Sequence, residues 1–356
     1  MARFCFALLA SCAILSGVAA AQTPSRVALL ALSKQDHTLS IVDPTDMHIV
    51  ATVPVGDDPH EVVASSDGKT AYVSNYGFGA FHTLAVIDLI AHAQKPFVEL
   101  GALKGPHGLD FNRGKVFFTA EAAKAIGSYD PAAGQIDWIM GTGQDRTHML
   151  FVFPDNKKII TTNVNAATVT VMEEVPARPF TPPPGMGPPP GSGGPPGGGP
   201  PPGFRPPPSG PQWELTVIPV GHGSEGFDIS PDGKEAWTAN AQDGTVSVID
   251  LATKKVTATL DVNARGANRL KFTPDGRYVL LSANALVVLD AATHKEVKRL
   301  ADVHANGGIQ MQPDGARVYV ACGRDNVVEA IDLKTWQKVG EVKIASPDGL
   351  AWAVQR

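Results

Sequence analysis

The sequence has 356 residues, a formal net charge of −5 and a charged fraction of 18%. This slightly acidic balance lacks the basic excess that marks nucleic-acid binding, so we expect no nucleic-acid partner. Outside the N-terminal segment, the apolar residues occur in runs too short to span a bilayer, and we expect no transmembrane segment.

The first 21 residues have the pattern of an export signal. Arg3 supplies a positive charge, residues 4–18 are mainly apolar, and Ala19-Ala20-Ala21 provides the small residues of a cleavage site. This pattern predicts cleavage after Ala21 and a periplasmic or secreted mature protein. Leu9-Ala10-Ser11-Cys12 also resembles a lipoprotein cleavage box, so lipidation of Cys12 stays open as an alternative.

Short strands separated by tight turns follow the signal. In the stretch 224–260, Pro231-Asp232-Gly233 and Gln242-Asp243-Gly244 separate runs of alternating apolar and polar residues. Such alternation between turns predicts an antiparallel meander of four strands. Similar segments open ~40–45 residues apart, except where an insert intervenes. These openings lie at Pro59, Pro106, Thr147, Ser224, Ala267, Asn306 and Pro347.

A repeat of this length, built from four strands, predicts a β-propeller. Residues 27–55 hold three strand patterns without a first strand, whereas residues 347–354 form a first strand with nothing after it. We therefore predict that the two ends of the chain combine into a seventh blade. The expected fold is an all-β, seven-bladed propeller of four-stranded antiparallel blades, closed by pairing of the N-terminal strands with the C-terminal strand. It forms a single domain over residues 22–356.

Residues 176–212 interrupt the third blade with a sequence dominated by proline and glycine. Such a composition buries too little apolar surface to offset the entropy of ordering, so it predicts a disordered insert. The insert is either a tolerated expansion of a loop or a tether for a partner in the cell envelope.

Two segments of the repeat, Asp67–Asn75 and Gly244–Asp250, resemble the YVTN-family β-propeller repeat. That family includes lactonase-like enzymes and proteins without known chemistry. The openings Pro59-His60 and Pro106-His107-Gly108 are similar to those of streptogramin lyase and lactonase-type propellers. This resemblance implies His and Glu residues on the axial face and, for the lyase, a divalent cation. The chain departs from those enzymes elsewhere, so no complete catalytic motif carries over.

Equivalent positions of the blades should form rings around the axis, because the first strands all begin at the same face. The second residues of the openings are His60, His107, His148, Glu225, Asn268, Gly307 and Asp348. The ends of the second strands contribute Asn75, Glu121, Asn163, Asn240, Ala283, Cys322 and Ser33. In this second ring we interpret Glu121 as the replacement of a repeat asparagine beside His107.

Imidazoles and carboxylates that converge from separate strands could hold a divalent metal such as Zn, Mn, Mg or Cu. The predicted ligands are His60, His107, His148, Glu225 and Glu121. As an alternative, these histidines only hydrogen-bond nearby backbone. If the site is catalytic, we expect His107, His148 and Glu225 to move protons.

Two functions therefore fit the sequence. One is an exported, monomeric binding protein whose axial site takes a small ligand, a metal or an envelope protein. The other is a metal-dependent lyase or lactonase that acts on a lactone or ester at the same site.

Overall fold

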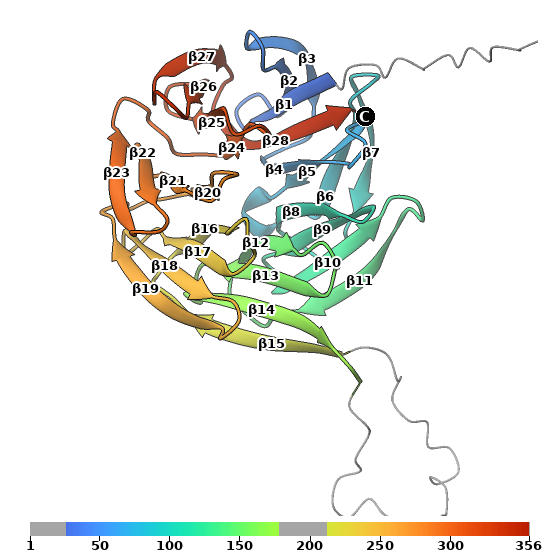
Figure 1. Ribbon diagram of the computed structural model, residues 1–356. Coiled ribbons are helices and arrows are strands. Elements are labelled where there is room, and N and C mark those ends of the chain that lie inside the picture. Colours follow the sequence, from blue (N-terminus) through green and yellow to red (C-terminus); the bar gives the residue numbers. More distant parts are fainter. Residues whose placement is uncertain (1–25, 178–211, 356) are drawn as a thin grey trace, which may run out of the picture.

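The computed structural model describes residues 26–177 and 212–355. In this part of the chain, 28 strands form seven four-stranded antiparallel sheets, arranged as blades around a central axis (Figure 1). The predicted seven-bladed propeller is confirmed. Gly77–Gly79 forms a short 3-10 turn, η1, and no helix of the described residues is long and apolar enough to cross a membrane.

The strands are numbered along the chain, and each blade runs from the axis outwards. Blade one contains β4 (Pro59–Ala64), β5 (Thr70–Asn75), β6 (Thr83–Asp88) and β7 (Ala93–Glu99). Blade two contains β8 (Pro106–Asn112), β9 (Lys115–Ala120), β10 (Ala125–Asp130) and β11 (Gln135–Gly141). Blade three contains β12 (Thr147–Val152), β13 (Lys158–Asn163), β14 (Thr168–Val175) and β15 (Gln212–Pro219). Blade four contains β16 (Ser224–Ile229), β17 (Glu235–Asn240), β18 (Thr245–Asp250) and β19 (Lys255–Asp261).

The remaining blades follow the same plan. Blade five contains β20 (Arg269–Phe272), β21 (Tyr278–Ser282), β22 (Leu286–Asp290) and β23 (Lys295–Leu300). Blade six contains β24 (Ile309–Met311), β25 (Arg317–Cys322), β26 (Val327–Asp332) and β27 (Lys338–Lys343). Blade seven combines both ends of the chain, as β28 (Pro347–Gln355), β1 (Arg26–Ser33), β2 (Thr38–Asp43) and β3 (His48–Pro54).

The recurrent Asp-Gly pairs make the turns between the first and second strands. In blade four, Asp232 Oδ1 accepts hydrogen bonds from the Ser230 hydroxyl at 2.7 Å and from the Lys234 backbone N–H at 3.1 Å. Gly233 follows with a φ of 72°, in the left-handed region that glycine adopts without strain. These aspartates are occupied by their own turns, which explains why the repeat keeps Asp-Gly at this position.

The blades are held together by apolar side chains from neighbouring sheets. Trp237 of β17 is fully buried, and its ring meets the ring of Phe272 in the next blade edge to face, with centroids 5.6 Å apart. Trp138 of blade two and Trp213 of blade three also meet between blades, with ring centroids 5.4 Å apart and ring planes tilted by 50°. Such aromatic pairs add to the burial of apolar area that stabilises a propeller. These tryptophans therefore pack between blades.

The ring closes in blade seven, where β28 pairs with β1 from Arg26↔Gln355 to Ser33↔Pro347. Trp352 of β28 also contacts blade six, because its Nε1–H donates to the Met311 carbonyl at 2.5 Å and its ring meets Tyr319 edge to face. The closing strand is therefore tied both to its own blade and to the neighbouring one.

The predicted insert at 176–212 is bounded by strands that pair along their whole length. β14 and β15 form a ladder that ends at Val175↔Gln212, so the chain leaves and re-enters the blade at adjacent points. Residues 178–211 and the predicted signal at 1–21 lie outside the described residues, and the disorder of the insert and the export of the protein stay predictions.

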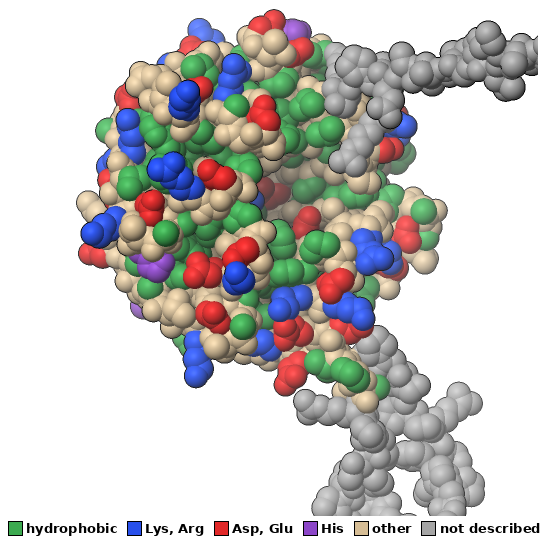
Figure 2. All heavy atoms as spheres, viewed as in Figure 1, with side chains coloured by type: hydrophobic (Ala, Val, Ile, Leu, Met, Phe, Trp, Pro, Cys, Tyr) green, Lys and Arg blue, Asp and Glu red, His purple; other side chains and the backbone are tan. Residues whose placement is uncertain are grey.

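Figure 2 shows one face of the ring, hollowed at its centre, with apolar and acidic side chains around the hollow. Basic and acidic side chains are interspersed over the rest of this face. Among the described residues, this face therefore carries no large patch of one charge, as expected from the similar numbers of basic and acidic residues in the sequence.

We predict that removal of residues 347–356 abolishes cooperative folding. The deletion removes the inner strand of blade seven and exposes the apolar side chains that pack against it. Exposure of each large side chain lowers the free energy of unfolding by about 1.5–3 kcal/mol. Thermal unfolding and size-exclusion chromatography would report the loss, with a chain that lacks only residue 356 as the control. A truncated protein that remained monomeric and melted sharply would contradict the importance of this closure.

Candidate functional site on the propeller axis

A cavity of about 460 Å³ lies on the axis, at the end where the first strands of the blades begin. The structure brings the predicted ring residues His60, His107, His148, Glu225, Asn268 and Asp348 into its lining. The lining also includes side chains that the repeat pattern did not point to, namely Lys34, Arg146, Arg269, Asn306 and Arg324. All seven blades therefore contribute to one site.

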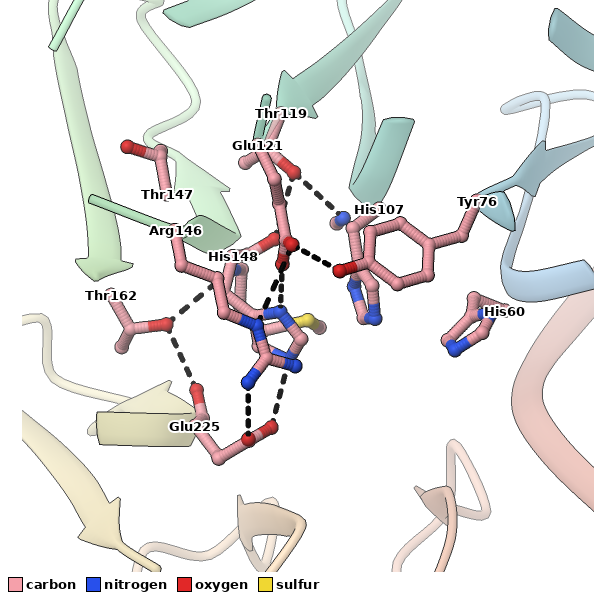
Figure 3. A network of polar contacts seen from close by, with 12 residues as sticks. His60, Tyr76, His107, Thr119, Glu121, Arg146, Thr147, His148, Thr162 and Glu225 are labelled. Carbon is pink, nitrogen blue, oxygen red and sulfur yellow. Dashed lines mark hydrogen bonds and ion pairs between the residues drawn. The ribbon is translucent and has the colours of Figure 1, made fainter. Parts of the chain in front are cut away.

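The three predicted histidines stand in a row. Ring centroids are 4.9 Å apart between His60 and His107, and 3.8 Å apart between His107 and His148. Tyr76, which follows β5, meets His60 and His107 edge to face at 4.8 Å and 5.1 Å (Figure 3). The three imidazoles therefore converge from consecutive blades, as the repeat pattern predicted.

His148 lies between two carboxylates and is almost completely buried. Its Nδ1 is 2.5 Å from Glu121 Oε1, and because a carboxylate only accepts, Nδ1 carries the proton. Its Nε2 is 2.9 Å from Glu225 Oε2, an ion-pair contact that is poorly aligned for a hydrogen bond. Burial alone would lower the pKa of His148, but Glu225 and Glu121 outweigh burial and raise this pKa above its ordinary value.

Arg146 bridges the same two carboxylates from the loop before β12. Its guanidinium lies 3.5 Å from Glu121 Oε2 and 3.4 Å from Glu225 Oε1. Burial opposes ionisation of Glu225, yet His148 and then Arg146 outweigh burial and lower its pKa to about 2. Tyr76 completes the network by donating its hydroxyl hydrogen to Glu121 Oε2 at 2.5 Å (Figure 3).

His107 differs from His148 because no carboxylate of the described residues lies within ion-pair distance of its ring. It is buried, and within the described residues its Nδ1 has no hydrogen-bond partner. Burial and then the charge of His148 hold the pKa of His107 well below its ordinary value, so this imidazole is neutral. A neutral, unpartnered imidazole is the form that binds metal ions.

His60 is engaged with a lysine instead. Lys34 Nζ lies 2.7 Å from His60 Nε2 and also contacts Asp58 and Asp348 at 3.4 Å and 3.5 Å. Because an ammonium group only donates, it occupies the lone pair of His60 Nε2. Burial, followed by the charge of Lys34, outweighs Asp348 and lowers the pKa of His60.

The structure brings only some of the predicted metal ligands within reach of one ion. The ligand atoms of His107, Glu121 and His148 all lie within 4.8 Å of one another, so this buried group could hold a metal ion. Glu225 adjoins it through His148, whereas His60 is not part of the group. An exposed set of Asp43, Asp46 and His48 meets the same distance limit at a turn of blade seven, where such acidic groups are common without an ion.

The interpretation of Glu121 as a replaced repeat asparagine is corrected by the strand register. Asn75 pairs with Pro59 at the start of its blade, but in blade two the residue that pairs with Pro106 is Ala120. The hairpin of blade two is tighter, since Asn112 pairs with Lys115 across a two-residue turn. Glu121 is therefore the first residue after β9, which is the position that Tyr76 takes after β5.

This equivalence is the signal that could have identified Tyr76 from the sequence. Arg146 could have been found in a similar way, because it directly precedes the opening at Thr147. Lys34 could have been found by the same equivalence, because it directly follows β1, whose last residue Ser33 pairs with Pro347.

A buried ion pair closes the inner end of the cavity. Arg269 of β20 contacts Glu61 of β4, and both side chains are buried. Arg269 lines the axial cavity and also a second cavity of about 350 Å³, which Glu61 lines as well. Burial raises the pKa of Glu61 in spite of Arg269, whereas Glu61 outweighs burial and raises the pKa of Arg269.

The acidic groups of the second cavity serve the fold. Asp110 accepts a hydrogen bond from the backbone N–H of Val152 at 2.8 Å, and Asp228 accepts one from Phe272 at 2.9 Å. Each bond joins the inner strands of neighbouring blades. Burial raises the pKa of Asp110 to about 6.

Comparison with known proteins supports the fold. The Cytochrome D1 heme domain family matches residues 218–310, which span blades four and five. No curated protein matches the sequence significantly.

Several solved structures share the whole architecture. A functionally unknown protein from Desulfotomaculum acetoxidans has a TM-score of 0.68 at 12% identity, covering 92% of this chain and 98% of its own. A candidate 6-phosphogluconolactonase from Bacteroides fragilis has a TM-score of 0.69 at 16% identity, covering 94% and 99%. Hydrazine synthase from Kuenenia stuttgartiensis has a TM-score of 0.61 at 16% identity, covering 82% and 89%. Likeness at these identities establishes a propeller fold that is shared by proteins of different chemistry.

Proposed function

We propose that the axial cavity binds a divalent transition-metal ion through His107 and His148, with Glu225 or Glu121 as the carboxylate ligand, and that a small polar molecule completes the site. The observation that carries this proposal is the state of the two imidazoles. Glu121 fixes the proton of His148 on Nδ1, which directs Nε2 toward Glu225, and His107 is neutral with an unpartnered nitrogen.

A carboxylate behind a histidine is the usual support for a metal-binding imidazole, because it fixes the tautomer and raises the basicity of the ligand. Two imidazoles with one carboxylate favour Zn²⁺ or Cu²⁺ over Mg²⁺, which prefers oxygen ligands. A bound ion would also supply Lewis acidity to a carbonyl group placed beside it. We further propose that the protein acts after export, as its N-terminal sequence predicts, and that its repeat is of the YVTN type.

We predict that wild-type protein binds Zn²⁺ in a one-to-one ratio and that the His107→Ala protein loses most of this binding, because one of two nitrogen ligands is gone. Elemental analysis after purification without chelators, followed by titration with Zn²⁺, Mn²⁺ and Cu²⁺, measures the effect. The matched control is His92→Asn, at an exposed turn with a φ of 52° that asparagine tolerates. Equal metal content in the His107→Ala and wild-type proteins would end the metal proposal.

We predict that metal binding releases a proton from His148. The raised pKa of His148 means that its imidazole still carries two protons at pH values where His107 is already neutral. Metal affinity should therefore increase as the pH rises through the His148 pKa, with a midpoint above the ordinary imidazole value of about 6.5. Calorimetry in buffers of different ionisation enthalpy counts the released proton. No proton release at pH 6.5 would show that His148 is not a ligand.

Hydrolysis or elimination on a lactone or ester is a second candidate function. The specific observation in its favour is the buried His148 between Glu121 and Glu225, which places an imidazole, a group that can give or take a proton, beside two carboxylates. The similar Bacteroides fragilis structure, named as a candidate 6-phosphogluconolactonase, is consistent with this chemistry.

For this second function we predict that the protein opens simple γ- and δ-lactones and that His148→Ala lowers the rate about 100-fold, the usual scale for loss of a proton-transfer group. A pH-stat assay follows the acid that metal-free and metal-loaded protein form, because His148 cannot transfer a proton while its Nε2 binds a metal ion; His92→Asn is again the control. Rates no higher than those in buffer would leave the site as a binding site.

A further inference from the structure

One half of the axial cavity presents hydrogen-bond donors. Asn268 of blade five accepts a hydrogen bond from Arg269 Nη1 at 2.7 Å through its Oδ1. Asn306 of blade six accepts one from the Gly323 backbone N–H at 2.6 Å, also through Oδ1. Because both neighbours can only donate, the two amide oxygens are fixed in place. Within the described residues neither amide NH₂ group donates a hydrogen bond, so both remain as donors at the cavity lining.

Arg324, in the loop after β25, adds a positive charge to the same half. It is exposed and lines the cavity mouth. Among the described residues no carboxylate lies within ion-pair distance of its guanidinium. The other cations of the cavity are all occupied, since Arg146 is held by two glutamates, Lys34 by Asp58 and Asp348, and Arg269 by Glu61.

Blade six also leaves this half open, because its ring position is Gly307 and carries no side chain. Of the described residues that line the cavity on this side, Asp348 of blade seven carries a carboxylate, and it is paired with Lys34 at 3.5 Å. The opposite half, from blades one to four, holds the histidines and the acceptors Glu121 and Glu225. The cavity thus has an acidic, imidazole-rich half and a half that offers donors.

We propose that the small molecule bound in the cavity carries an anionic group, a carboxylate or a phosphate, which binds to Asn268, Asn306 and Arg324. Its other polar end then faces His107 and His148. Planar guanidinium and amide donors match the oxygen atoms of such groups, and charge-assisted hydrogen bonds are the stronger kind. This inference rests on the proposed function, because it assumes that the cavity takes a ligand, and it adds the chemical class of that ligand.

Calorimetric titration of metal-free protein with inorganic phosphate and with malonate, at constant ionic strength, tests the inference. At least one of the two anions should bind, and the preferred one identifies the group as phosphate or carboxylate. Arg324→Gln should weaken this binding about tenfold, the scale of one charged hydrogen bond. Asn306→Asp should abolish it, because it keeps the acceptor for the Gly323 N–H and replaces the free donor with a second negative oxygen. Arg113→Gln, at the exposed turn between β8 and β9, is the matched control and should bind as wild type does.

Zn²⁺ titration of the same variants separates this inference from the metal proposal. Arg324→Gln should keep wild-type Zn²⁺ affinity, since Arg324 does not adjoin the His107, Glu121 and His148 group. Anion binding that needs Arg324 in a protein without Zn²⁺ affinity would support the anion site and overturn the metal site. Absence of binding by both anions, or equal binding by wild-type and Arg324→Gln proteins, would overturn the anion site whatever the outcome with Zn²⁺.

Discussion

The pairing of β28 with β1 is the contact on which the rest of the molecule depends. It places both ends of the chain in one sheet and leaves each blade with two neighbours. Once the ring is closed, the start of every inner strand has a fixed distance and direction from the axis. Residues that are separated by more than 200 positions in the chain, such as Glu61 and Arg269, then meet across the centre. The functional site is thus a product of closure, because no single blade contains more than a part of it.

The same closure removes charged groups from water, which is costly unless each charge finds partners. The axial site meets this condition with a connected set, in which Glu121 and Glu225 share His148 and Arg146. Removing one member would leave the others buried and unpaired, and such losses are larger than the net contribution of an intact pair. A positive ion bound beside His148 would be stabilised by the two carboxylates, Glu121 and Glu225, that lie on either side of this imidazole.

The fold and the row of histidines could be predicted because both depend on the period of the repeat. Strand alternation and the Asp-Gly turns set the blade length, and the second residue of each opening marks the axis. Glu121 was assigned to the wrong ring position because a tighter hairpin shifts the register of blade two, and spacing alone does not reveal the type of a turn. His60 was grouped with the other histidines because its contact with Lys34 comes from another blade. Pairing between charges of different blades depends on side-chain direction, which a repeat pattern does not specify.

The Glu61–Arg269 pair affects how a ligand could move along the axis of the propeller. Arg269 lines both cavities and Glu61 lines the second, so a ligand that moved along the axis from one cavity to the other would have to pass this pair. The segment inserted after β14 joins the blade at the far rim, because β14 runs away from the mouth. A partner bound to that segment would lie on the side of the propeller opposite the mouth of the axial cavity, and the mouth would remain accessible. An anion that entered through the mouth would meet Arg324, which is exposed and lines the cavity.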